Sequence, residues 1–226
     1  MGGTGRTPGV KFLPGEARMQ ANSKIPIPTL TRLATYYSVL GDAEKRGVQS
    51  LNSAKIEALC GIAATQVRKD LSHFGEMGKP GVGYEVSVLR KHIGKVLHLD
   101  RIQQVVIIGA GRLGQALAAY PGLSEYSFKV VGLFDEDKEK IGCKVGGLAI
   151  EDAAQLRKRL PELDAKLVVL AVPGFAAQTA ADAAVAGGAR LILNFTPAHV
   201  KVPNNCLVRD VSFTQEFAVL AYYSEV

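Results

Sequence analysis

A strand, a glycine-rich turn and a helix near the middle of the chain constrain the fold more than any other stretch. Four β-branched residues end the run Gln104–Ile108, the next six residues read Gly-x-Gly-x-x-Gly, and helix-forming residues follow over Gln115–Tyr120. This order predicts the strand, tight turn and helix of a dinucleotide-binding unit. We therefore expect an α/β fold of the Rossmann type in the second half of the chain.

The glycines of this turn have separate expected roles. Gly109 permits the tight turn, Gly111 lets the backbone approach a pyrophosphate, and Gly114 lets helix and strand pack closely. The start of the helix offers unpaired N–H groups and a partial positive charge to the phosphates. The cofactor-binding residues predicted here are Gly109, Ala110, Gly111, Arg112, Leu113 and Gly114.

An acidic residue follows at the distance that a ribose contact requires. Asp135 comes directly after the predicted strand Phe128–Phe134 and lies 21 residues beyond Gly114. An acid at this place hydrogen-bonds the ribose 2′-hydroxyl, and its charge repels a 2′-phosphate. The sequence therefore predicts NADH and NAD+ as ligands in preference to their 2′-phosphorylated forms. The alternative is a structural turn with a surface acid.

Composition excludes several other classes of protein. The 226 residues contain no apolar run of membrane-spanning length and no charged-then-apolar leader. Three cysteines, Cys60, Cys143 and Cys206, are odd in number and far apart, which fits neither a disulfide framework nor a metal cluster. We expect a cytoplasmic protein with no metal site and no membrane contact.

The positive charge is confined to the first half of the chain. Residues 1–98 carry 14 Lys and Arg against 7 Asp and Glu, whereas residues 99–226 carry 13 against 14. A basic excess in one domain suggests a polyanion partner for that domain, and the alternative is a solvated basic surface.

The basic half reads as a winged helix-turn-helix. A helix over about residues 29–46 precedes two short helices, one capped by Asn52 or Ser53 and the other beginning near Ala64. We expect Thr29 or Thr31 to cap the first of the three. The DNA-binding residues predicted on the last helix are Gln66, Arg68, Lys69, Ser72 and His73, opposite a buried face of Val67, Leu71 and Phe74.

A glycine-rich turn after that helix predicts the wing. Lys79, Gly81 and Tyr84 lie in a hairpin whose tip is small and basic enough to approach a minor groove. The alternative is an idle hairpin. The segments expected are a disordered leader over residues 1–23, the DNA-binding domain and a linker helix over 24–99, the Rossmann-like domain over 100–211 and a terminal helix over 212–226.

The remaining predicted strands complete the dinucleotide site, and no catalytic centre is expected among them. Val172 ends an apolar run and Pro173 opens the helix after it, and the strand 190–194 ends at Asn194. These strand ends are expected to lie at one ligand-binding edge. Only 32 residues follow Asn194, and His199 has no obvious carboxylate partner there. We therefore expect a sensor without catalytic residues. The rival readings are an NAD-dependent oxidoreductase with an appended helical domain and a regulator that responds to CoA or another nucleotide.

The last helix is too apolar to remain exposed. It covers about residues 212–225 and carries Phe213, Phe217 and Leu220 on one face. This face would cover its own sheet edge or cross to a second copy of the chain and form a swapped dimer.

Motifs in both halves together resemble the Rex family of redox-sensing transcriptional repressors. The match runs from about Lys24 to the C-terminus, in order. The motifs that carry it are Val67–Gly75 (Val-Arg-Lys-Asp-Leu-Ser-His-Phe-Gly), Gly81–Tyr84 (Gly-Val-Gly-Tyr), Gly109–Gly114, Tyr120–Gly122 (Tyr-Pro-Gly) and Leu193–Pro197 (Leu-Asn-Phe-Thr-Pro).

The resemblance implies a homodimer that binds a palindromic operator and releases it when NADH binds. It also implies an exchanged terminal helix, with Phe213 near the partner's nicotinamide and Tyr120 near the cofactor. Family members often place an Arg in the first helix and an Asp before the aromatic residue, and these join a network in the NAD+ state. Here the corresponding positions hold Ser38 and Ser212.

Overall fold

The computed structural model describes residues 25–72, 78–79 and 82–224. The chain forms two compact units, and the division between them falls between Ile102 and Gln103. The expected leader, residues 1–23, lies outside the described residues. None of the helices in the described ranges is long and apolar enough to cross a membrane.

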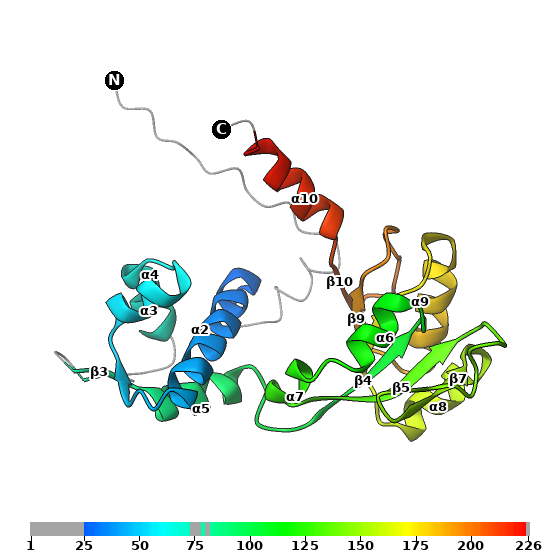
Figure 1. The fold of residues 1–226 in the computed structure, drawn as a ribbon, viewed down its shortest axis with the longest axis horizontal. Coiled ribbons are helices and arrows are strands. Elements are labelled where there is room, and N and C mark those ends of the chain that lie inside the picture. Colours follow the sequence, from blue (N-terminus) through cyan, green and yellow to red (C-terminus); the bar gives the residue numbers. More distant parts are fainter. Residues whose placement is uncertain (1–24, 73–77, 80–81, 225–226) are drawn as a thin grey trace. The chain divides into compact units, whose positions relative to one another are not determined.

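The first unit combines helices with a small antiparallel sheet (Figure 1). Its described helices are α2 (Ile27–Lys45), α3 (Ser53–Cys60), α4 (Ala64–Ser72) and α5 (Val86–Val96). Its strands are β1 (Ser50–Leu51), β2 (Gly78–Lys79) and β3 (Gly83–Glu85), in the order β1-β3-β2. This is the winged helix-turn-helix that the sequence predicts.

Local signals set the turn between α3 and α4. The Asn52 side chain accepts a hydrogen bond from the backbone N–H of Lys55 at 2.9 Å, which caps α3 as predicted. Gly61 follows the last residue of α3 and caps it in the left-handed conformation, with φ of 72°. Ile56 and Val67 are fully buried and pack the two helices into the core. The short turn therefore holds α4 at a fixed angle to α3.

The start of α2 differs from the prediction. The helix begins at Ile27 after Pro26, and neither Thr29 nor Thr31 caps it. Pro28 stands in the first turn, where a missing N–H costs nothing because that N–H has no partner inside a helix. The Thr31 hydroxyl instead donates to the carbonyl oxygen of Ile27 at 3.1 Å, within the helix.

A buried carboxylate ties α4 to α2. Asp70 is 1% exposed and accepts two hydrogen bonds from the Arg32 guanidinium, at 2.6 and 2.7 Å. It also accepts from the Tyr36 hydroxyl at 2.9 Å and from the Gln66 amide at 2.8 Å. Burial alone raises the pKa of Asp70, but these hydrogen bonds outweigh it and the pKa is lowered.

The second unit is built on a seven-stranded sheet in the order β10-β9-β8-β4-β5-β7-β6. All neighbouring pairs are parallel except β6 with β7. The strands are β4 (Gln103–Ile108), β5 (Phe128–Asp135), β6 (Lys144–Val145), β7 (Leu148–Asp152), β8 (Leu167–Leu170), β9 (Leu191–Asn194) and β10 (Leu207–Asp210). The chain order reverses between β4 and β8, which is where open α/β sheets bind ligands.

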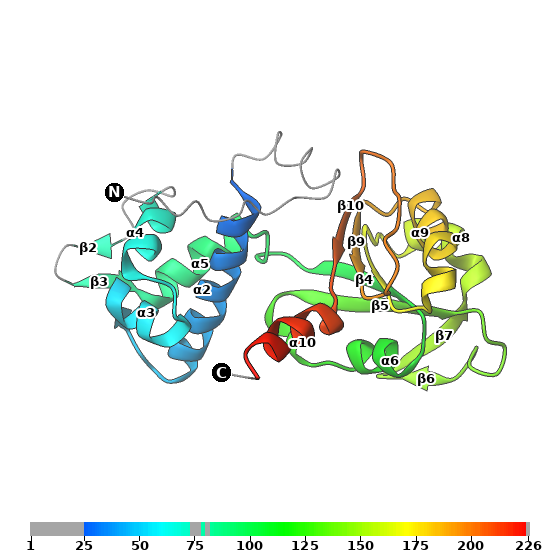
Figure 2. The same ribbon diagram turned by 90° about the horizontal axis from the view of Figure 1, so that it is seen from above.

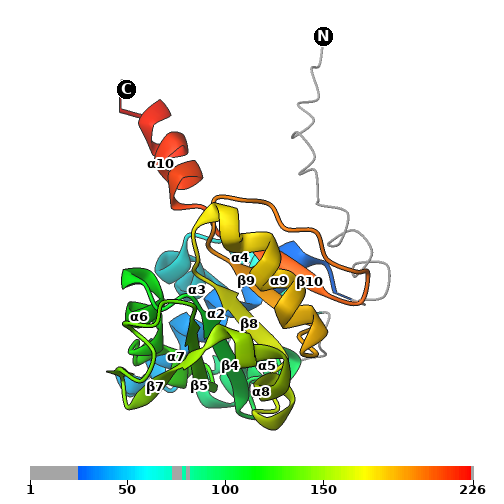
Figure 3. The ribbon, with the colours of Figure 1, turned by 90° about the vertical axis from the view of Figure 1, so that its right-hand side faces the viewer.

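Helices cover both faces of this sheet (Figure 3). They are α6 (Arg112–Ala118), α7 (Gly122–Glu125), the 3-10 turns η1 (Ala153–Gln155) and η2 (Gly174–Ala176), α8 (Leu156–Glu162), α9 (Ala177–Ala186) and α10 (Phe213–Tyr222). One core joins α8 and α9 to Ile108 and Phe134, and the other joins α6 to Ile107 and Leu133. Alternate residues of β4 and β5 therefore serve opposite cores.

The terminal helix α10 is exposed along its whole length. Phe213 is 55%, Phe217 69% and Leu220 63% exposed, although all three are large and apolar. Figure 2 shows α10 joined to the sheet through β10. The start of the helix is capped, because the Ser212 hydroxyl accepts from the backbone N–H of Gln215 at 3.3 Å.

We predict that Asp70→Ala lowers the free energy of unfolding of the DNA-binding unit by about 3 kcal/mol, because it leaves Arg32 without its buried partner. The folded-state pKa of Asp70 is lowered, so its stabilising effect is complete above the unfolded-state value of about 3.9. The effect disappears as the pH falls through the folded-state pKa. Denaturant unfolding of the full chain at pH 7 and at falling pH measures this. The control Asp42→Ala removes an exposed carboxylate and should change the free energy of unfolding little. An equal effect of both substitutions would contradict the prediction.

Candidate functional site

The glycine loop has the geometry that close approach requires. Gly109 has φ of 101°, and a Cβ there would run into the backbone carbonyl of Ala171. A Cβ at Gly114 would run into the carbonyl oxygen of Gly109, so α6 lies directly against the end of β4. A Cβ at Gly111 would meet nothing within 4 Å. The loop is thus packed on one side and open on the other.

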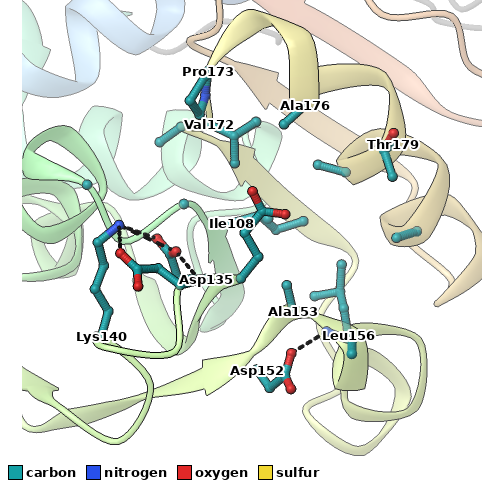
Figure 4. A pocket seen from close by; sticks show the side chains of 18 of the residues that line it. Ile108, Asp135, Lys140, Asp152, Ala153, Leu156, Val172, Pro173, Ala176 and Thr179 are labelled. Carbon is teal, nitrogen blue, oxygen red and sulfur yellow. Dashed lines mark hydrogen bonds and ion pairs between the residues drawn. The ribbon is translucent and has the colours of Figure 1, made fainter.

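A cavity of about 890 Å³ adjoins the open side of the loop. Figure 4 shows its lining side chains, which come from the ends of β4 and β5, the start of α8 and the segment from Val172 into α9. Seven residues predicted to bind a cofactor line it: Gly109, Gly111, Arg112, Leu113, Asp135, Val172 and Pro173. Its volume and its place at the carboxyl ends of parallel strands suit a dinucleotide.

The other four predicted cofactor residues do not line this cavity. Ala110 and Gly114 belong to the glycine motif but are buried, and they do not face the cavity. Tyr120 is 59% exposed, and its ring covers Gly122 so closely that a Cβ there would lie 2.5 Å from the ring. Phe213 stacks on Phe195, with ring centroids 5.9 Å apart.

Asp135 connects β5 to the glycine loop. Its Oδ2 accepts from the backbone N–H of Ala110 at 2.7 Å, and its Oδ1 accepts from the backbone N–H of Asp137 at 2.9 Å. The ammonium group of Lys140 lies 3.3 and 3.4 Å from the two oxygens (Figure 4). Burial raises the pKa of Asp135, but the backbone hydrogen bonds and Lys140 outweigh it, and the pKa is lowered.

Sequence reasoning missed one wall of the cavity. Glu136, Asp137 and Lys140 follow β5, while Asp152 ends β7 and Arg157 lies in the first turn of α8. The small side chains of Ala176, Ala180 and Ala183 form the opposite wall. A signal for the first group was present, because charged residues cluster directly after Asp135 in the sequence.

The expectation that His199 lacks a carboxylate partner was wrong. Its Nδ1 lies 2.9 Å from Oδ2 of Asp210, the last residue of a strand that the sequence pattern did not predict. The Asn194 amide donates to Asp210 at 2.7 Å and to the carbonyl oxygen of Ala198 at 2.8 Å. Because His199 is 74% exposed, the group serves to tie the loop after β9 to β10.

Neither the cavity beside the glycine loop nor the His199–Asp210 pair contains a metal-binding group among the described residues. Across residues 25–72, 78–79 and 82–224, no group of three or more His, Cys, Asp or Glu side chains is arranged to hold an ion.

The predicted DNA-binding residues fall into two groups on α4. Arg68, Lys69 and Ser72 are exposed, and Arg68 donates to the Ser53 hydroxyl at 2.7 Å. Gln66 is only partly exposed, and its amide donates to Asp70. The chain therefore presents cations on one face of α4 and fixes the opposite face in the core.

The wing is described only in part. Lys79 pairs with Gly83 across β2 and β3, and the ring of Tyr84 lies over Gly78. The predicted contacts His73 and Gly81 lie outside the described residues.

Two family models match successive parts of the chain. One is described as a putative DNA-binding protein N-terminus and matches residues 24–72. The other is described as a CoA binding domain and matches residues 100–198. The first covers α2, α3 and α4, and the second covers the glycine loop and most of the large sheet.

Solved structures and curated relatives match over most of the chain. The crystal structure of RSP in complex with β-NAD+ and operator DNA has a TM-score of 0.84 at 30% identity, covering 89% of this chain and 93% of that one. RSP in complex with β-NADH gives a TM-score of 0.81 at 29% identity, with 89% and 94% covered. The redox-sensing transcriptional repressor Rex of Syntrophomonas wolfei is 40% identical over 200 residues, covering 88% of this chain and 95% of the relative. Rex of Thermus thermophilus is 43% identical over 199 residues, covering 88% and 93%. The chain therefore belongs to the Rex family of redox-sensing transcriptional repressors.

Proposed function

We propose that this protein is a DNA-binding repressor, not an enzyme, that releases its operator when NADH binds. The observation that carries the proposal is the presence, in one chain, of an exposed basic α4 and a dinucleotide-sized cavity beside the glycine loop. The similarity to RSP structures that contain NADH, or NAD+ with operator DNA, supports both halves of it.

The DNA contacts are assigned to the exposed face of α4 and to the wing. Arg68 and Lys69 supply cations for phosphates and donors for base edges. Gln66 belongs to the proposed DNA-binding set, although its amide already donates a hydrogen bond to Asp70. The full proposed set is Gln66, Arg68, Lys69, Ser72, His73, Lys79, Gly81 and Tyr84.

The dinucleotide is held by the loop and by the strand ends around it. Gly111 leaves room for the pyrophosphate beside the start of α6, and Asp135 faces the adenosine ribose. Val172 and Pro173 line the path toward the nicotinamide. The bound dinucleotide is not consumed in this proposal. The rings of NADH and NAD+ differ by one positive charge and in planarity, and an apolar nicotinamide site favours the neutral ring of NADH.

A homodimer accounts for the exposure of α10. A helix with Phe213, Phe217 and Leu220 exposed is stabilised when a second copy covers it. In the proposed dimer, α10 crosses to the partner, and Phe213 approaches the partner's nicotinamide with Tyr120 nearby. Dimer closure on NADH then moves the two recognition helices away from the spacing of a palindromic operator.

The redox discrimination of this chain does not use the Arg and Asp found in many relatives. Ser38 is exposed on α2, and the Ser212 hydroxyl caps α10. Neither side chain carries a charge that would respond to the positive nicotinamide of NAD+. The preference for NADH therefore rests on burial of the ring. The protein acts in the cytoplasm, where NADH and DNA are both present.

We expect Arg68→Ala together with Lys69→Ala to weaken operator binding at least about thirtyfold, because each removes a contact worth roughly 1–3 kcal/mol. NADH affinity stays within twofold. Gel shifts and NADH titration by calorimetry measure the two effects. Lys91→Ala with Lys95→Ala removes the same charge from exposed positions of α5 and is the control. Intact operator binding in the α4 variant would refute the assignment.

Gly111→Ala should weaken NADH binding at least about tenfold without changing stability. Its Cβ meets open space in the protein but occupies the room that the pyrophosphate needs. Gly114→Ala is the contrasting variant, because its Cβ collides with the backbone of Gly109 and lowers the melting temperature. NADH affinity in Gly111→Ala equal to that of the wild type would show that the pyrophosphate lies elsewhere.

A further inference from the structure

We propose that Lys140 is a specificity-determining residue of the dinucleotide site, and that it gives the 2′-phosphate of NADPH a cation to bind. This inference rests on the proposed function, because it concerns the adenosine end of the same cavity. It changes the role expected for Asp135, whose charge alone would repel a 2′-phosphate.

Both oxygens of the Asp135 carboxylate already face donors of this chain. A carboxylate offers about four lone-pair sites. Ala110 and Asp137 occupy one on each oxygen through their backbone N–H groups, at 2.7 and 2.9 Å. Lys140 occupies the other two, at 3.3 and 3.4 Å. A ribose hydroxyl that bonds to Asp135 must therefore displace one of these donors.

Lys140 is the donor that can be displaced. The N–H groups of Ala110 and Asp137 are fixed by the backbone, and their bonds are short. The contacts of Lys140 are at or beyond the usual limit for a hydrogen bond, and its side chain is 38% exposed. The same ammonium group lies 3.4 Å from Asp137, so two carboxylates hold it at the cavity wall.

This position places a cation beside the 2′-carbon of the ribose. When the ribose hydroxyl takes the place of the ammonium group, Lys140 remains at the wall that it lines together with Asp135 and Asp137. A 2′-phosphate there meets the flexible ammonium group as well as the acid. The attraction between the Lys140 ammonium group and the 2′-phosphate offsets part of the repulsion between that phosphate and Asp135. Rejection of NADPH is therefore weaker than Asp135 alone would impose.

The test compares NADH and NADPH affinities by calorimetry in the full-length protein and in Lys140→Met. We expect the ratio of the NADPH to the NADH dissociation constant to rise about tenfold in the variant. The ratio is the quantity to read, because the attraction of Lys140 for the shared pyrophosphate cancels in it. ADP-ribose and its 2′-phosphorylated form should show the same change, since they lack the nicotinamide.

Two further variants make the outcome decisive. Lys138→Met removes an equal charge from an exposed position two residues away and should leave the ratio unchanged. Asp135→Asn should lower the ratio, and Lys140→Met in the same chain should reverse that gain.

An unchanged ratio in Lys140→Met, with NADH still bound by the wild type, would overturn the role of Lys140 alone. Equal losses of both affinities would also overturn it, because they would make Lys140 a mere support for the loop. A wild-type protein that binds neither dinucleotide would overturn the proposed function as well.

Discussion

The hydrogen bond from the backbone N–H of Ala110 to Asp135 is the contact on which the second unit depends. It joins the carboxyl ends of β4 and β5 at the point where the glycine loop turns into α6. Because the bond is buried and 2.7 Å long, breaking it would leave the N–H of Ala110 without a partner and remove one of the donors that stabilise the Asp135 carboxylate. The loop is thus held by this chain's own contacts, and its open side at Gly111 is where we propose that the pyrophosphate binds.

A buried carboxylate that accepts several hydrogen bonds also anchors the DNA-binding unit. Asp70 is buried between α2 and α4 and holds Arg32, Tyr36 and Gln66. The recognition helix is therefore anchored by charge on its inner face while Arg68 and Lys69 stay exposed on the outer one. In the proposed dimer, the spacing between the two copies of α4 sets the operator affinity.

Local patterns predicted the elements that local physics controls. The turn at Gly109, the acid at Asp135 and the cap at Asn52 depend on neighbouring residues, and the sequence indicated each of them. The contacts of Asp70 were not predicted, because Arg32 and Tyr36 come from a distant helix. Arg32 is 38 residues from Asp70, and no pattern joins them. Lys140 lies only five residues from Asp135 and was missed for another reason, since the charge cluster after Asp135 does not show which side chain turns back to it. β10, with Asp210 at its end, was missed because its short run is recognisable only beside β9.

We propose that one chain couples operator affinity to the redox state of the nicotinamide. The most direct test measures operator binding at a fixed total dinucleotide concentration while the NADH to NAD+ ratio is varied, using a palindromic duplex selected from random DNA by the dinucleotide-free protein. We expect operator affinity to fall by roughly 5–150-fold as NADH replaces NAD+, and operator to lower the affinity for NADH relative to that for NAD+ by the same factor. Operator affinity that is independent of the ratio would contradict the proposal.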